Sequence, residues 1–172
     1  LDADTVSVSL SVTQGVLTLS RTNGLTFSTG DGSADAAISF SGTKADVNAA
    51  LAGLTYRANS NYNGSDTLFI TTSDLGATGS GGTLTDTDTV SITVSPVNDA
   101  PVNTVPSAQT VNEDTDLVFS TANGNLIAVA DLDADTVSVS LSVTQGVLTL
   151  SRTNGLTFST GDGSADAAIS FS

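Results

Sequence analysis

Oxygen-bearing side chains are concentrated in two short segments of the sequence. In the first, PVNDAP (96–101), Asn98 and Asp99 stand between two prolines. In the second, DLDAD (131–135), aspartates occupy alternate positions. Ca²⁺ binds about 6–8 oxygens from carboxylates, amides, backbone carbonyls and water, and alternating acids in an extended segment can offer several of these to one ion. Because the prolines stiffen the first segment, the pattern predicts a calcium ion that locks this stretch of chain.

Neither segment matches a standard calcium loop. The aspartates of DLDAD fit the first ligands of an EF-hand, but Thr136 stands at the sixth position in place of glycine and Ser142 at the twelfth in place of glutamate. The glycine-rich nonapeptide array of a calcium β-roll is absent from the sequence. A third acidic stretch, GDGSAD (30–35), is predicted to be a solvated turn, because aspartate is common in turns for local hydrogen bonding. That local role is also the alternative interpretation of the other acids.

The overall charge limits the possible partners. The chain has 18 acidic and 4 basic side chains, for a net charge of −14 at pH 7. Nucleic acid and anionic lipid would repel such a surface, and no apolar run approaches the ~18 residues of a membrane helix. We therefore expect no nucleic-acid binding and no membrane insertion, and we expect divalent cations as counter-ions. Adaptation to high salt is an alternative explanation of the charge, but it does not explain acids beside a proline-flanked stretch.

The composition argues against catalysis. The sequence contains no Cys and no His, which excludes disulfides, thiolate metal sites and the usual general base. A Ser or Asp nucleophile would need an unusual base, and carboxylate pairs without a cleft pattern are weak evidence for glycosidase chemistry. We expect a structural or binding protein rather than an enzyme.

The residues are organised in a tandem repeat. The first 41 residues recur without change in the last 41, from Leu132 to Ser172, at an offset of 131. Identical copies indicate recently duplicated modules of a long array, and an engineered duplication is the alternative. Residues 1–99 are predicted to be one module that lacks its N-terminal strand or strands. Residues 100–172 are then the start of the next module, truncated at its C-terminus, and PVNDAP is the linker.

Side-chain periodicity predicts short strands between Gly- and Asn-rich turns. In TVSVSLSV, apolar residues from Val6 to Val12 alternate with Ser, which is the period-2 pattern of a half-buried strand. The Asn23–Gly24 pair predicts a hairpin between the second and third strands, because both residues tolerate positive φ. The predicted strands are Thr5–Val12, Val16–Ser20, Leu25–Ser28, Ala37–Ser41, Leu54–Arg57, Asp66–Thr72 and Asp88–Ser95.

One segment has helical periodicity. In TKADVNAALAGL, Val47 and Ala50 recur at helical spacing. Thr43 is a suitable N-cap and Gly53 a suitable stop, so we expect a short helix over Lys44–Ala52. Together the elements predict an all-β fold, an antiparallel β-sandwich with one short helix at an end or edge.

The motifs at the module boundary resemble a known family. PVNDAP at the boundary, NEDTD one strand later and AVADLDAD after the second strand resemble a cadherin repeat. The sequence is more similar to the bacterial cadherin-like and immunoglobulin-like repeats of giant secreted adhesins, including RTX adhesins exported by type I secretion. NSNYNGSDTLFITTSD and DTDTVSITVSPVNDAP resemble the last third of such repeats. The resemblance covers nearly all of one period and implies a Greek-key β-sandwich on the bacterial cell surface.

The resemblance also implies a set of calcium ligands between successive modules. Its members are acids or amides at the positions that hold calcium in cadherins, and they are Asp66, Asn98, Asp99, Glu113, Asp131 and Asp133. The sequence departs from animal cadherins at Asp66, where the Asp-Arg-Glu triplet is absent, and this leaves the number of ions per joint open. Further candidates are Asp135 beside the joint, and Asp2, Asp4, Asp74, Asp86 and Asp88 at the other end of the first module.

The function implied by the resemblance is mechanical. We expect a spacer in a cell-surface adhesin, stiffened by calcium at each joint, with neighbouring repeats of the same polypeptide as its partners. Direct carbohydrate or protein recognition is the alternative, with Tyr62 as the best aromatic candidate. Two interpretations of the incomplete modules stay open. Either the sequence is part of a longer continuous array, or fragments exchange strands head to tail, with the segment Pro101–Asp131 docked onto the open edge of a neighbouring chain's first module.

Overall fold

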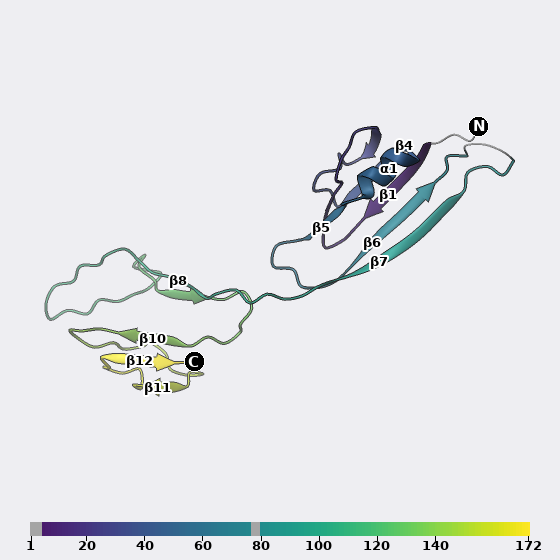
Figure 1. Ribbon diagram of the computed structural model, residues 1–172. Coiled ribbons are helices and arrows are strands. Elements are labelled where there is room, and N and C mark those ends of the chain that lie inside the picture. Colours follow the sequence, from purple (N-terminus) through teal and green to yellow (C-terminus); the bar gives the residue numbers. More distant parts are fainter. Residues whose placement is uncertain (1–4, 77–79) are drawn as a thin grey trace. The chain divides into compact units, whose positions relative to one another are not determined.

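The computed structural model describes residues 5–76 and 80–172 (Figure 1). The candidates Asp2 and Asp4 lie outside these residues. The chain divides into two compact units, Leu1–Val97 and Asn98–Ser172, which we call unit 1 and unit 2. The division falls after Val97, two residues before the boundary expected from the sequence.

A five-stranded antiparallel sheet is the main element of unit 1. Its strand order is β3-β4-β1-β6-β7, and β6 and β7 form its longest pair (Figure 1). The structure confirms the predicted all-β class with antiparallel sheets and one short helix. The strands are β1 (Thr5–Ser11), β3 (Leu25–Thr29), β4 (Ala37–Thr43), β6 (Gly64–Ser73) and β7 (Thr85–Val94).

A smaller layer packs on one face of this sheet. It consists of the paired strands β2 (Gly15–Thr18) and β5 (Thr55–Ala58) and the helix α1 (Lys44–Leu51). Leu17 from β2 and Val47 from α1 join Val8 and Phe40 of the main sheet in one buried cluster. The alternation of apolar and hydroxyl side chains along β1 therefore directs its apolar face into this core.

The helix begins as the sequence predicts. The Thr43 hydroxyl accepts a hydrogen bond from the Asp46 N–H at 3.1 Å and donates one to Asp46 Oδ2 at 2.8 Å. This reciprocal cap satisfies a backbone N–H that has no partner within the helix. The helix ends at Leu51, one residue earlier than predicted, and Gly53 follows with φ +95°.

The predicted Asn23–Gly24 hairpin is wrong. β2 pairs with β5, and β3 pairs with β4, so the two strands that flank the turn lie in different sheets. The turn itself forms, with Gly24 at φ +81° and the Leu25 N–H bonded to the Thr22 carbonyl at 3.2 Å. The local turn chemistry was correct, but packing of β2 on the core decided its partner.

Unit 2 contains two small antiparallel sheets. One pairs β8 (Val102–Thr104) with β9 (Ala128–Ala130). The other has the order β10-β12-β11, which matches β1-β4-β3 in the identical sequence of unit 1. Its strands are β10 (Val139–Ser142), β11 (Phe158–Thr160) and β12 (Ala168–Phe171). In the part of the chain that is described, no helix is long and apolar enough to cross a membrane.

Candidate functional site

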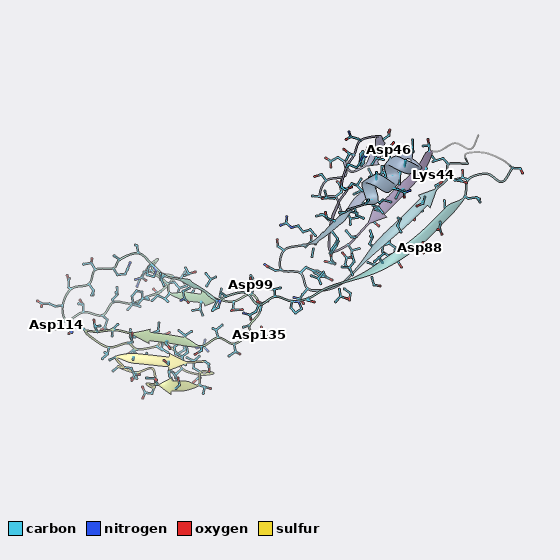
Figure 2. All side chains as sticks on the ribbon, in the orientation of Figure 1. Lys44, Asp46, Asp88, Asp99, Asp114 and Asp135 are labelled. Atoms are coloured by element: carbon cyan, nitrogen blue, oxygen red, sulfur yellow. The ribbon has the colours of Figure 1, made fainter. Side chains whose placement is uncertain are left out.

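The pairing of β8 with β9 brings the linker to the acidic segment DLDAD. Val102 pairs with Ala130, so the linker before β8 and the acids after β9 lie at the same end of unit 2. The Asp99 N–H donates a hydrogen bond to Asp133 Oδ2 at 2.5 Å. Figure 2 shows Asp99 and Asp135 at this end of unit 2. Two segments that are 34 residues apart in sequence are therefore joined by a direct hydrogen bond, and the calcium ion expected between them stays a prediction.

Local hydrogen bonds occupy part of this acidic segment. Asp131 Oδ1 accepts the N–H groups of Asp133 and Ala134, each at 2.8 Å. The Ala134 and Asp133 N–H groups hold the pKa of Asp131 below its usual value because they stabilise the charged form. The Asn98 side-chain amide donates to the Asp99 carbonyl at 3.2 Å. Asp131 thus caps this turn and stays ionised at neutral pH.

The donor set has the chemistry that Ca²⁺ prefers. Asn98, Asp99, Asp131 and Asp133 offer carboxylate and amide oxygens, and all but the half-buried Asp131 are exposed. Among residues 5–76 and 80–172, however, no three acidic side chains are grouped closely enough to hold a metal ion. The structure places these four candidate residues in one region without assembling them into a coordination shell.

Glu113 does not belong to this group. It lies in the long connection between β8 and β9, next to Asp114, and Figure 2 shows Asp114 at the opposite end of unit 2 from Asp99. Within unit 2, the structure therefore separates Glu113 from the linker.

Asp66 lies in unit 1 and is buried, with 4% of its surface exposed. Its carboxylate accepts five hydrogen bonds. Two come from the N–H and hydroxyl of Thr13 at 3.1 and 2.8 Å, and one from the Gln14 N–H at 2.9 Å. The others come from the Tyr56 hydroxyl at 2.9 Å and the Thr67 N–H at 2.8 Å. These contacts tie the β1–β2 connection to β6 and β5, a structural role that sequence analysis did not anticipate.

The hydrogen bonds keep Asp66 charged despite its burial. Burial alone would raise its pKa, but the N–H groups of Gln14, Thr13 and Thr67 and the Thr13 hydroxyl outweigh it and hold the pKa well below the usual range. Burial and the hydrogen bond to Asp66 raise the pKa of the Tyr56 hydroxyl, which keeps it a donor. The carboxylate and its donors thus form one satisfied polar network.

A pH titration is expected to reveal this network. Because the folded-state pKa of Asp66 is depressed, its stabilising contribution is fully present above its unfolded-state pKa of about 3.9. The contribution is lost as the pH falls below that value towards the folded-state pKa. The difference in unfolding free energy between the wild type and Asp66→Asn should therefore shrink from about pH 6 to about pH 2. Urea unfolding followed by circular dichroism measures this difference, and a constant value across the range would contradict the role given to Asp66.

The second set of candidate calcium ligands lies at the end of the β6–β7 pair. Asp74 Oδ1 accepts the N–H groups of Leu84 at 2.8 Å and Gly76 at 2.9 Å, which lower its pKa. Asp86 and Asp88 follow on β7, opposite Thr72 and Ile70. Both are exposed. Asp74 closes the connection between the two strands, and a calcium role for this set stays a prediction.

A regular hydroxyl surface covers the outer face of the main sheet and was not singled out from the sequence. Two rows of Ser and Thr cross all five strands, in the order β3, β4, β1, β6 and β7. The first row is Thr26, Ser41, Ser7, Ser73 and Thr85. The second row is Thr29, Ser39, Ser9, Thr71 and Thr87. Neighbouring hydroxyls bond across strands, as in Ser9–Ser39 at 2.9 Å. A hollow of about 320 Å³ lies on this face and is lined partly by Ser7, Ser9 and Leu75. The period-2 alternation in the sequence could have predicted the rows, but the strand order was needed to align them.

No family model, curated protein or solved structure matches the chain. Tyr62, the aromatic candidate, is only partly exposed, and its hydroxyl donates to the Ser65 carbonyl at 2.6 Å.

Proposed function

We propose that the chain is a calcium-stiffened spacer of a bacterial cell-surface adhesin, which projects a distal ligand-binding region away from the cell. The identical copies at a 131-residue offset support a tandem array. The two compact units support a modular organisation in which each repeat folds largely by itself. In the complete repeat we propose a Greek-key β-sandwich, with neighbouring repeats as partners.

The contact between Asp99 and Asp133 is the observation that carries this proposal. It attaches the proline-flanked linker to the turn after β9, so the linker is held at one end of unit 2. An anchored linker transmits force and limits bending better than a free one, because fewer backbone conformations remain available. This property is useful to a spacer and irrelevant to a freely tethered binding domain.

Calcium would act on the same segment. When bound, the ion would supply positive charge among acids that otherwise repel one another. Asn98, Asp99, Asp131 and Asp133 are the residues we assign to it. The hydrogen bond from the Asp99 N–H to Asp133 and the turn capped by Asp131 hold these acids close to one another, which lowers the conformational cost of binding an ion.

Thermal unfolding in calcium tests this assignment. A ligand that binds only the folded form stabilises it by roughly 2.7 kcal/mol at a hundredfold excess over its dissociation constant. We expect a higher Tm in millimolar CaCl₂ than in EDTA, and we expect Asp133→Ala to abolish the gain. Asp114→Asn is the control, because it also removes one negative charge but lies at the opposite end of unit 2. An equal gain in NaCl of matched ionic strength would instead support general charge screening.

Direct recognition of a carbohydrate is the second candidate, and the outer hydroxyl face of unit 1 favours it. Its rows of Ser and Thr offer many donors and acceptors beside a hollow. Isothermal titration of the chain with oligosaccharides distinguishes the two functions. Binding that Ser9→Val weakens would support recognition, whereas the spacer needs no ligand of its own.

A further inference from the structure

Four asparagines in the chain are followed directly by glycine, and they are Asn23, Asn63, Asn123 and Asn154. At such a pair the backbone nitrogen of the glycine can attack the side-chain amide carbon of the asparagine, because glycine has no Cβ to hinder the approach and its backbone rotates freely. All four asparagines are exposed, so exposure does not distinguish them. The contacts around each pair decide which of them can react.

Hydrogen bonds hold both reacting groups at Asn123. Its side-chain amide nitrogen donates to the Val118 carbonyl at 2.9 Å, and its backbone N–H donates to the Ser120 hydroxyl at 3.2 Å. The nucleophile would be the nitrogen of Gly124, whose N–H donates to the Thr121 carbonyl at 3.1 Å. Attack on the side chain therefore requires these contacts to break first.

Strand pairing restrains the pair Asn63–Gly64. Gly64 is the first residue of β6 and pairs with Val94 of β7. Ring closure would draw the Gly64 nitrogen towards the Asn63 side chain and away from the extended geometry of the strand. Reaction at this pair therefore requires the end of the β6–β7 ladder to open.

The turn at Asn23–Gly24 leaves both reacting groups free. A hydrogen bond from the Leu25 N–H to the Thr22 carbonyl at 3.2 Å closes the turn without using the Gly24 N–H. The pairing of β3 with β4 begins only at Leu25. Among the described residues, the Asn23 side-chain amide has no hydrogen-bond partner. Neither group therefore has to be released before attack.

The same turn occurs at Asn154, in the second copy of the sequence. There the Leu156 N–H donates to the Thr153 carbonyl at 3.1 Å, and Gly155 has φ +87°, close to the +81° of Gly24. Because the geometry recurs in both copies, the free Asn-Gly turn belongs to the repeat itself.

One charge of each sign lies near the site in unit 1. The Arg21 guanidinium donates to the Asn23 carbonyl at 3.5 Å and to Asp46 Oδ1 at 3.4 Å, and the Asp46 carboxylate packs against Gly24. Their effects on the Gly24 N–H oppose each other, because a cation favours loss of its proton and an anion disfavours it. The conformation of the turn is therefore the main determinant of reactivity.

We propose that Asn23 and Asn154 are sites of spontaneous deamidation. The glycine nitrogen forms a bond to the asparagine Cγ and gives up its proton, and the Cγ–Nδ2 bond breaks as ammonia leaves. Water then opens the cyclic imide at either of its carbonyls, which yields aspartate or isoaspartate. The net reaction consumes a water molecule and releases ammonia, so each event adds a negative charge to a chain whose net charge is −14.

Tryptic digestion makes the two copies separately measurable. Cleavage after Arg21 and Lys44 releases residues 22–44, and cleavage after Arg152 releases residues 153–172. Each of these peptides contains a single asparagine, at the proposed site. The other two Asn-Gly pairs lie in the peptide of residues 58–152, where fragment ions locate the modified residue.

Mass spectrometry of the folded chain after prolonged incubation at neutral pH tests the proposal. We expect Asn23 and Asn154 to deamidate about tenfold faster than Asn63 and Asn123, because opening a restrained site costs about the net energy of one hydrogen bond. Asn23→Gln is the control, since its longer side chain closes the ring more slowly. It should remove the acidic form of the peptide 22–44 while Asn154 still reacts.

A parallel incubation in guanidinium chloride separates the effect of the fold from that of the sequence. All four pairs should react at similar rates there, because each has glycine in the next position and the native contacts are gone. Similar rates at all four pairs in the folded chain would overturn the proposal. So would a folded chain in which Asn23 and Asn154 stay intact while the same residues react in the denaturant.

Discussion

Replacing Asp66 by alanine is expected to destabilise unit 1 by about 3 kcal/mol, because it breaks a buried hydrogen-bond network around a carboxylate. The substitution leaves the N–H groups of Thr13, Gln14 and Thr67 without their acceptor inside the protein. Each unsatisfied buried donor costs about 1–3 kcal/mol, although these costs do not add fully. Urea unfolding in EDTA measures the effect.

The same experiment separates the structural role of Asp66 from the calcium role implied by the resemblance. A residue that serves only as a calcium ligand should be replaceable in EDTA without loss of stability, and its replacement should remove only the gain caused by calcium. Asp74→Ala is a useful control, since Asp74 accepts two backbone N–H groups but is partly exposed. We expect this control to lose about 1 kcal/mol or less. An Asp66 variant as stable in EDTA as Asp74→Ala would contradict the structural role.

The second large effect is expected from a matched pair of core substitutions. Leu17 has 0% of its surface exposed, whereas Leu148, which occupies the same place in the identical copy, is only half-buried. Leu17→Ala should cost about 3–4 kcal/mol, because it removes buried methyl groups and leaves a cavity. Leu148→Ala should cost about 1 kcal/mol, because less apolar surface is returned to water.

Hydrogen exchange with mass spectrometry can assign each loss to its unit. Peptides from the two 41-residue copies are identical, so the readout must use unique sequence, such as residues 44–76 for unit 1 and residues 102–131 for unit 2. Leu17→Ala should accelerate exchange in the first set and leave the second unchanged. Equal effects of Leu17→Ala and Leu148→Ala on their own units would show that the two copies are packed equally well, against the burial described above.

Most of the elements could be predicted from the sequence, because their causes are local. Alternation of apolar and hydroxyl residues indicated each strand of unit 1, and the reciprocal cap at Thr43 indicated the start of the helix. The candidate site was predicted less completely. The approach of Asp99 to Asp133 followed from their place around the linker. The burial of Asp66 could not be predicted from the sequence, because the five hydrogen bonds to its carboxylate come from three separate parts of the chain.

The same 41-residue sequence occurs in both units, so a comparison of the two copies distinguishes structural features with local causes from features that depend on tertiary packing. In both copies of GDGSAD the last aspartate, Asp35 or Asp166, accepts the same three backbone N–H groups at 2.9, 2.9 and 3.2 Å. The cross-strand hydroxyl contact is likewise kept, at 2.9 Å for Ser9–Ser39 and 2.8 Å for the equivalent pair in unit 2. These features recur in different surroundings, so the sequence by itself determined them.

The length and burial of the strands differ between the copies, so tertiary structure decided them. β1 has seven residues and β10 has four, and Val8 is 2% exposed whereas its copy Val139 is only half-buried. β1 lies between β4 and β6, while β10 is the edge strand of its sheet. A turn is closed by hydrogen bonds between residues close in sequence, but a strand needs at least one partner strand, and its burial needs an apolar layer over its face. In unit 1, segments that are distant in sequence supply the partner strands and the apolar layer. No short stretch of sequence determines that these segments pack together.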